Sequence, residues 1–297
     1  MARALERACR PRRPLRCVAA RVALRARTTR RDTPRIRHAL LLVAVAPFAL
    51  AACGPFGANA VDPYAPPADP HATRLGAHTL LAQGEGAGIS PAVTSPISTQ
   101  PAGSALIAFN AGYAVNESPP TDSQGNLWTA LGPPVVYAGY QGRFDVKAYL
   151  ALHARGGAAH TLSVVKNGNA RGELTLPFIE IRNAGRLQDV ASNYAPAART
   201  QRSARVTTTG PALLLALWWG DGAFLEQSAR PSSGFAVIEN FVRLPEGSAV
   251  QCVVAVRNVE AAGTYDVEWS VSPAQRAPLW LLAFERDATL AATAPPH

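Results

Sequence analysis

A stretch near the middle of the chain decides the fold class: it reads FDVKAYL from Phe144 to Leu150. Its apolar residues Phe144, Val146, Ala148 and Leu150 fall on one face of an extended chain, because side chains alternate between the two faces of a strand. Strict alternation of this kind indicates a half-buried β-strand and does not fit the 3.6-residue period of a helix. The stretch 264–271 has the same alternation, with Val267 and Trp269 on the predicted buried face.

Two other runs are apolar at every position, which is typical of central strands that are covered on both faces. They are Leu213–Trp219 and Cys252–Val256. Short apolar or alternating runs recur from about residue 104 to 284, with Gly, Pro, Asn or Asp between them, and none carries a helical stripe over eleven or more residues. The sequence therefore predicts an all-β fold, an antiparallel β-sandwich of jelly-roll type with about 10–12 strands. A doubly wound sheet would need helices between the strands.

The composition divides the chain into four predicted parts. Residues 1–52 form a basic leader, and residues 53–99 are rich in Pro, Ala and Gly, which predicts a flexible tether. Within this tether, only Thr79–Ala82 could form a turn or an additional edge strand. Residues 100–285 carry the sandwich, and residues 286–297 are small and polar enough for a frayed tail.

The net charge of +9 belongs to the leader rather than to the body of the protein. Residues 1–53 contain 13 arginines and only two acidic residues, whereas the body has 16 basic and 18 acidic side chains. Phosphate affinity requires basic residues on the folded surface, so a nucleic-acid partner is not expected.

The leader contains an uncharged run, Ala39–Leu50, which is shorter than the roughly 20 residues that a membrane-spanning helix requires. This length is that of an export signal. The last residue of the run begins the segment Leu50-Ala51-Ala52-Cys53, which resembles the lipobox of bacterial lipoproteins. The resemblance implies that the signal is cleaved before Cys53, that Cys53 is acylated, and that a lipid anchor attaches the protein to a membrane. With Gly54 behind the cysteine, it implies the outer membrane. The alternative is a plain signal peptide that is cut near Ala52.

A second resemblance rests on the segment Asp122–Leu131, which reads DSQGNLWTAL. It resembles the D-S-x-G-N-x-[WY]-x-x-L hairpin of a β-sandwich domain that is common in exported bacterial proteins. The similarity extends over about residues 103–284 and implies the fold, but it implies no shared catalytic residues. The chain departs from this pattern at Ala212–Gly222, which is unusually aromatic.

The candidate binding residues are Trp218, Trp219 and Asp221, at the end of one of the apolar runs. Consecutive strand residues face opposite ways, so one indole could stack on a sugar while Asp221 accepts hydrogen bonds from its hydroxyls. The alternative is that both indoles are buried, one on each face of a central strand. Tyr113, Tyr137 and Tyr140 would add to an aromatic patch, but their spacing does not place them together.

Catalytic and metal-binding motifs give weaker signals. The chain has no G-x-S-x-G, S-x-x-K or H-E-x-x-H motif. The weaker candidates are two carboxylate pairs, two histidines beside one glycine turn, a calcium loop that has too few oxygen ligands and that an Asx turn explains without an ion, and a lone cysteine best interpreted as a buried hydrophobic residue. These are Asp221 with Glu226, Asp266 with Glu268, His153 with His160, the loop 122–126, and Cys252.

The sequence thus favours a membrane-anchored exported lipoprotein with a non-catalytic β-sandwich that has a binding or structural role. A glycan is the favoured ligand class, and no metal or cofactor is expected. Two alternatives stay open. One is a hydrolase that acts on polysaccharides of the cell envelope, and the other is an assembly subunit that pairs through an edge strand.

Overall fold

The computed structural model describes residues 71–113, 118–166, 168–221, 227–232, 234–242 and 250–286. The predicted signal peptide, Cys53 and residues 287–297 lie outside the described residues. Within the described part, no helix has the length and apolarity needed to cross a membrane.

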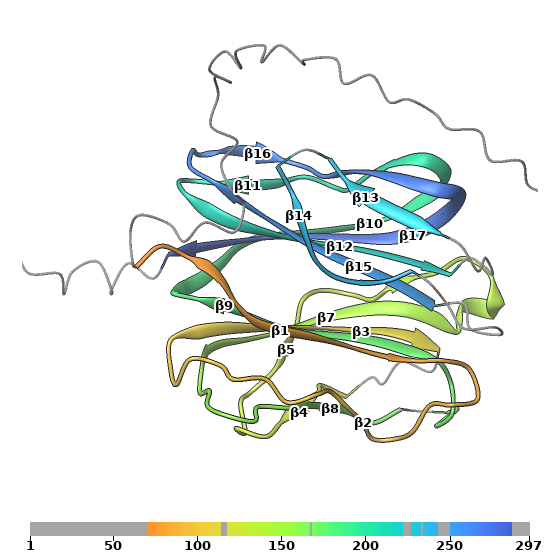
Figure 1. The fold of residues 1–297 in the computed structure, drawn as a ribbon. Helices are drawn as coiled ribbons and strands as arrows, with labels where there is room; N and C mark the ends of the chain where they lie inside the picture. The colour runs from red at the N-terminus through yellow and green to blue at the C-terminus, as the bar shows by residue number, and fades with distance from the viewer. Residues whose placement is uncertain are drawn as a thin grey trace, which may run out of the picture. The chain divides into compact units, whose positions relative to one another are not determined.

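The first half of the described chain forms two antiparallel sheets (Figure 1). The larger sheet has the order β1 (Arg74–Gln83), β9 (Leu174–Arg182), β3 (Ser104–Tyr113), β7 (Phe144–Ala154) and β5 (Thr129–Ala130), with β6 (Val135–Val136) also paired to β7. The smaller sheet has the order β2 (Ala92–Val93), β8 (Leu162–Val164) and β4 (Thr121–Asp122).

The second half repeats this arrangement. Its larger sheet has the order β10 (Ala184–Arg202), β17 (Glu268–Arg286), β12 (Ala212–Asp221), β15 (Val250–Val259) and β14 (Ala236–Phe241), with β13 (Ser228–Pro231) also paired to β17. The short strands β11 (Val206–Thr208) and β16 (Gly263–Tyr265) pair with each other, as β2 and β8 do in the first half.

The strand order in each half is that of a jelly roll. The first long strand lies beside the last long strand of the same half, which lies beside the second, which in turn lies beside the third. The predicted all-β fold with antiparallel sheets is therefore confirmed. The chain builds the arrangement twice, once in residues 74–182 (the first roll) and once in residues 184–286 (the second roll).

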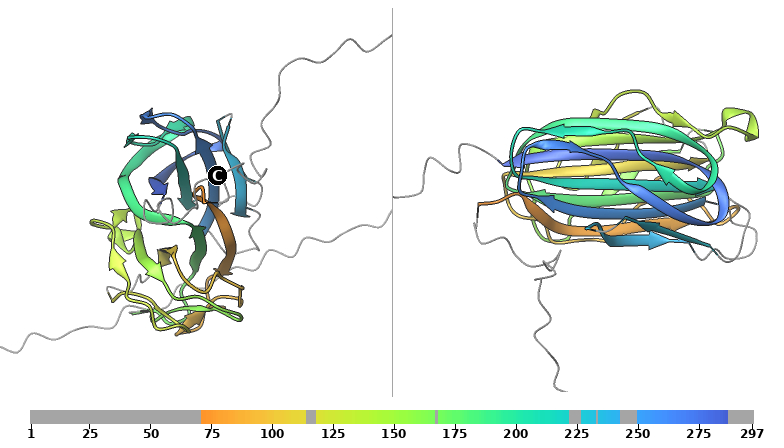
Figure 2. Two further views of the ribbon diagram at one scale, coloured as in Figure 1. Left: turned by 90° about the vertical axis from the view of Figure 1, so that its left-hand side faces the viewer. Right: turned by 90° about the horizontal axis from the view of Figure 1, so that it is seen from above.

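The two large sheets pack face to face, and the central core of the protein lies between them (Figure 2). This core contains Phe109 of β3, Trp219 of β12 and Trp280 of β17. Each large sheet also buries its other face, the first against β2 and β8 and the second against an outer layer that includes Val206 and Trp269. Because β12 and β15 are covered on both faces, their residues are apolar at nearly every position, as the sequence predicted.

The predicted tether is wrong from Arg74 onward, because β1 and β2 lie within residues 53–99. β1 is an edge strand that pairs only with β9, and all ten of its residues are partly exposed. Because neither face of this strand is fully buried, its sequence lacks a strict alternation of apolar and polar residues. Only residues 79–82 could therefore be identified as a possible strand from the sequence. At this edge, His78 Nδ1 lies 2.7 Å from Glu239 Oε1 of β14, which links the two rolls.

Candidate functional site

The structure buries both candidate indoles completely, so the predicted outward-facing tryptophan is wrong. Trp219 faces the central core and donates a hydrogen bond from Nε1 to Oγ1 of Thr175, at 2.9 Å. Trp218 faces the interior of the second roll and donates to Oε1 of Gln201, at 2.7 Å. The reason is that β12 is a central strand with layers on both sides. Asp221 ends β12, and its side chain lies outside the described residues.

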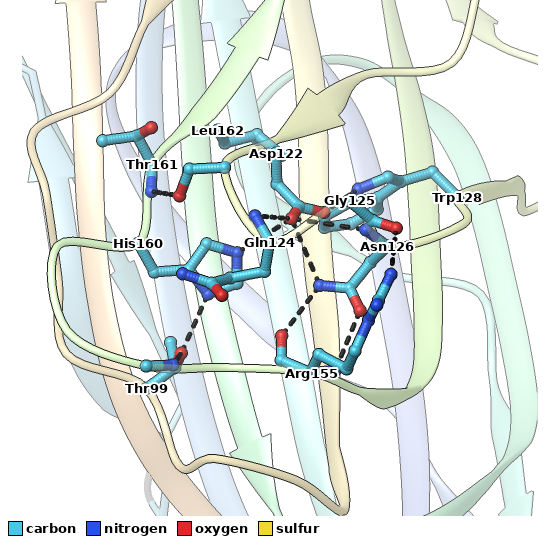
Figure 3. Close-up of polar contacts among 12 residues, drawn as sticks. Thr99, Asp122, Gln124, Gly125, Asn126, Trp128, Arg155, His160, Thr161 and Leu162 are labelled. Carbon is cyan, nitrogen blue, oxygen red and sulfur yellow. Dashed lines mark hydrogen bonds and ion pairs between the residues drawn. The ribbon is translucent and has the colours of Figure 1, made fainter.

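The hairpin segment that begins at Asp122 forms a compact network of polar contacts (Figure 3). Oδ1 of Asp122 accepts hydrogen bonds from the backbone N–H of Gln124 at 2.8 Å and from the amide of Asn126 at 3.2 Å. Oδ2 accepts one from the indole of Trp128 at 2.7 Å. The donor groups point N–H dipoles at the carboxylate and would repel a cation. The Asx-turn interpretation therefore explains this loop, and the calcium interpretation does not.

His160 and Thr99 extend this network into a line of three functional groups (Figure 3). His160 Nε2 lies 3.2 Å from Asp122 Oδ1, and His160 Nδ1 lies 2.8 Å from Thr99 Oγ1. A hydroxyl, an imidazole and a carboxylate in this order resemble a catalytic relay. However, the side chains of Asp122 and His160 are fully buried, and Thr99 is 6% exposed. The three groups cross-link β4, the segment before β3 and the segment before β8, out of reach of a substrate.

This relay is not apparent from the sequence. Its members are far apart in the chain, at positions 99, 122 and 160, and no spacing rule connects them. The one available signal was the hairpin motif, which identified Asp122, Asn126 and Trp128 as a unit without showing that His160 completes it.

The network controls the ionisation of Asp122. Burial raises the pKa of its carboxyl group, but hydrogen bonds from His160, from Trp128 and from the backbone N–H groups of Gln124 and Asn126 together lower the pKa to about 2. The charged form of Asp122 is therefore favoured more strongly in the folded state than in the unfolded chain, where the pKa is about 3.9.

This shift predicts a specific loss of stability in acid. A carboxyl group with a lowered folded-state pKa stabilises the fold above its unfolded pKa, and the contribution is lost as the pH falls through the folded value. We expect urea unfolding to show a loss of about 1–2 kcal/mol between pH 4 and pH 2 that Asp122→Asn lacks. Identical pH profiles for the two proteins would contradict the assignment.

The remaining candidates from the sequence occupy other surroundings. Asp266 and Glu268 both form ion pairs with the guanidinium of Arg202, at 3.3 and 2.7 Å. His153 is exposed, whereas His160 is buried in the relay. Among the described residues, no group of three or more potential ligands could hold a metal ion. Glu226 lies outside the described residues.

The structure brings together aromatic residues that the sequence could not place. Tyr137 lies at the centre, with ring centroids 5.7 Å from Tyr194, 5.9 Å from Trp219 and 6.3 Å from Tyr140. Phe144 lies 5.0 Å from Tyr140 and 6.4 Å from Trp219. The result is a column of rings that begins on the buried Trp219 and ends on Tyr140, which is 49% exposed. The side chain of Tyr113 lies outside the described residues.

Tyr140 is presented by a turn that projects from one end of the sheets, coloured yellow-green in Figure 2. Tyr140 and Gln141 both adopt left-handed backbone conformations, with φ of 47° and 58°. Such conformations are unfavourable for residues other than glycine and persist only when their surroundings hold them. Here the second roll contributes, because the backbone N–H of Ala138 donates to the hydroxyl of Tyr194, at 3.0 Å.

The functional conclusion rests on the features described above, because comparisons with known proteins add no match. No family model, no curated protein and no solved structure matches the chain.

Proposed function

We propose that this protein is an exported bacterial lipoprotein, held at the outer membrane by an acylated Cys53, whose paired jelly rolls form a non-catalytic glycan-binding module. The lipobox Leu50–Cys53 supports the anchor. The partly exposed ring of Tyr140, at the end of a buried aromatic column, is the observation that carries the binding function.

The Tyr140 turn has the properties of a sugar-stacking platform. An aromatic ring offers a flat apolar face to the C–H face of a sugar, and its hydroxyl can bond at the edge. The exposed Arg143 donates from Nε to the Tyr140 carbonyl at 3.1 Å, so the same turn also carries a guanidinium for contact with sugar hydroxyls. Because Tyr137 and Tyr194 support the turn, little conformational entropy is lost on binding.

The polar groups of the described residues favour a binding module over a hydrolase. The Asp122–His160–Thr99 relay is closed to solvent, and Asp266 and Glu268 both form ion pairs with Arg202. A glycosidase needs two carboxyl groups about 5–9 Å apart around an accessible bond, one of which carries a proton.

Binding to polysaccharides tests the proposal directly. We expect the purified protein to bind at least one member of a panel of envelope polysaccharides, including peptidoglycan and lipopolysaccharide, and we expect Tyr140→Ala to weaken this binding about tenfold. Tyr140→Phe, which keeps the ring, and Leu127→Ala, which alters a side chain that is 91% exposed elsewhere on the surface, serve as controls that retain binding. Equal affinities for the wild type and Tyr140→Ala, or no saturable binding to the panel, would refute the proposal.

A further inference from the structure

β3 and β7 carry an amide, an amine and a carboxyl group on one face of the first large sheet. Asn110 of β3 and Lys147 of β7 are direct partners in the antiparallel ladder, and Asp145 lies two positions before Lys147. Side chains two positions apart share a face of a strand, so the three groups project from the same side of the sheet. This side also carries Leu106, which belongs to the core between the larger and smaller sheets.

The amide of Asn110 is buried without a hydrogen-bond partner. Asn110 is 2% exposed, and neither its Oδ1 nor its Nδ2 is bonded to any of the residues that the structure describes. Buried polar groups are nearly always hydrogen-bonded, so an unpartnered amide in a folded protein requires an explanation. A covalent bond to a neighbouring side chain provides one, and it needs neither a cavity nor access from solvent.

Lys147 is placed to reach this amide. Residues directly opposite each other on antiparallel strands have Cβ atoms about 4.5–5.5 Å apart, and the flexible four-carbon stem of lysine spans a distance of this size. Nζ of Lys147 lies 5.6 Å from the centre of the Tyr149 ring, so the amine lies over the same face of β7. The amine of Lys147 and the amide of Asn110 are therefore neighbours on one side of the sheet.

Asp145 provides a group that can exchange protons beside them. Its Oδ1 is buried without a hydrogen-bond partner in the described part of the chain. Burial raises the pKa of Asp145 to about 6, although the charge of Lys147 opposes the shift. The carboxyl group can therefore take up and release a proton near neutral pH, as a general acid–base catalyst does. The charge of Asp145 also raises the pKa of Tyr149, which shows that these side chains lie close together.

We propose that Lys147 and Asn110 join in an intramolecular isopeptide bond, with Asp145 as the group that transfers the protons. The ammonium group of Lys147 first gives a proton to the carboxylate of Asp145. The neutral amine then attacks Cγ of Asn110 and forms the Nζ–Cγ bond. The Cγ–Nδ2 bond breaks, and Nδ2 leaves as ammonia with a proton from Asp145, which takes one back from Nζ. The reaction consumes no oxidant, cofactor or second substrate.

The product removes the unfavourable features of this face. The new amide is uncharged, and the protonated carboxyl group of Asp145 can donate a hydrogen bond to its carbonyl oxygen. The bond also ties β3 to β7 and closes the loop between residues 110 and 147, which restricts the unfolded chain as a disulfide does. This inference does not depend on the proposed glycan-binding function.

Mass spectrometry of the purified protein after digestion with trypsin tests the bond. Trypsin cuts after Arg143, Lys147 and Arg155, and no Lys or Arg lies between residues 75 and 142. An isopeptide bond blocks cleavage at Lys147. We therefore expect a branched product in which peptide 75–143 is joined to peptide 144–155, with a mass below the sum of the two by one ammonia, about 17 Da. Its fragment ions should place the link between Lys147 and Asn110.

Four variants assign the roles of the three groups. Lys147→Arg and Asn110→Leu each remove a reactant, and we expect both to fold, as circular dichroism checks, but to lack the branched product. Asp145→Asn keeps the size of the side chain but cannot transfer the protons, so the yield should fall to about a tenth or less. Lys166→Arg is the matched control, because it changes the other lysine of the chain, whose Nζ donates to Oε1 of Gln83 at 2.6 Å, and it should keep the full yield.

The digest of the wild type decides the question even if a variant does not fold. Release of the separate peptides 144–147 and 148–155 as the main products would show that Lys147 is free and would overturn the proposal. A branched product that persists in Asn110→Leu would place the link at another residue, with the same consequence. An undiminished yield in Asp145→Asn would overturn the role given to Asp145.

Discussion

Replacing Trp219 by alanine is expected to lower the free energy of unfolding by about 3–5 kcal/mol, as is typical of large-to-small changes in a packed core. Trp219 is fully buried between the two rolls, next to Tyr137 and Phe144, and its Nε1 donates to Thr175 of β9 across the interface between the large sheets. The substitution therefore leaves a cavity at the interface and removes the N–H donor to Oγ1 of Thr175, whose hydroxyl still donates to the carbonyl oxygen of Ala111. Urea unfolding followed by circular dichroism measures the loss.

Two further variants make this prediction specific. Trp219→Phe keeps a ring in the core but removes the hydrogen bond to Thr175, so it should cost about 1–3 kcal/mol and still fold. Leu127→Ala changes a side chain that is 91% exposed and should alter stability by no more than about 0.5 kcal/mol. If Trp219→Ala costs as little as Leu127→Ala, the face-to-face packing of the two large sheets is not what stabilises the protein.

The sequence predicted those strands that have one apolar face and one polar face. In β7, Val146 and Ala148 are fully buried in the central core, as their alternation with Asp145 and Lys147 indicated. The continuous apolar runs identified β12 and β15 as central strands for a related reason, since both of their faces are covered.

The duplication of the roll was not visible in the sequence. The two halves share the strand order of their large sheets but not the residue types of their strands. β3 reads SALIAFNAGY, whereas β12, which has the same place in the strand order of the second large sheet, reads ALLLALWWGD. Burial can be satisfied by many combinations of side chains, so an architecture can repeat without a recognisable repeat in the sequence.

The candidate site was predicted poorly because it depends on contacts between distant segments. Alternation shows that Trp218 and Trp219 face opposite ways, but it cannot show that a second layer covers each face. The placement of Tyr140 depends on Tyr194 and Trp219, which belong to the other roll. Only local features, such as the Asx turn at Asp122, follow from neighbouring residues alone.

Changing Cys53 to serine is expected to release the protein from the membrane fraction and to abolish its metabolic labelling with palmitate. If the resemblance to the lipobox holds, Cys53 carries all of the acyl chains. A single chain contributes about 0.8 kcal/mol per buried methylene and holds a protein only marginally, whereas several chains anchor it firmly, so losing them all removes the attachment.

The matched control is Cys252→Ala, because Cys252 is the one cysteine among the described residues. Its thiol is fully buried in the central core, and burial raises its pKa far above the ordinary value, which keeps it protonated and unreactive. Cys252→Ala should therefore keep both the palmitate label and the membrane attachment. Labelling that survives Cys53→Ser would exclude Cys53 as the acylation site. Loss of labelling with continued membrane attachment would mean that something other than the lipid holds the protein there, and the proposed glycan-binding surface around Tyr140 would be the first candidate to test.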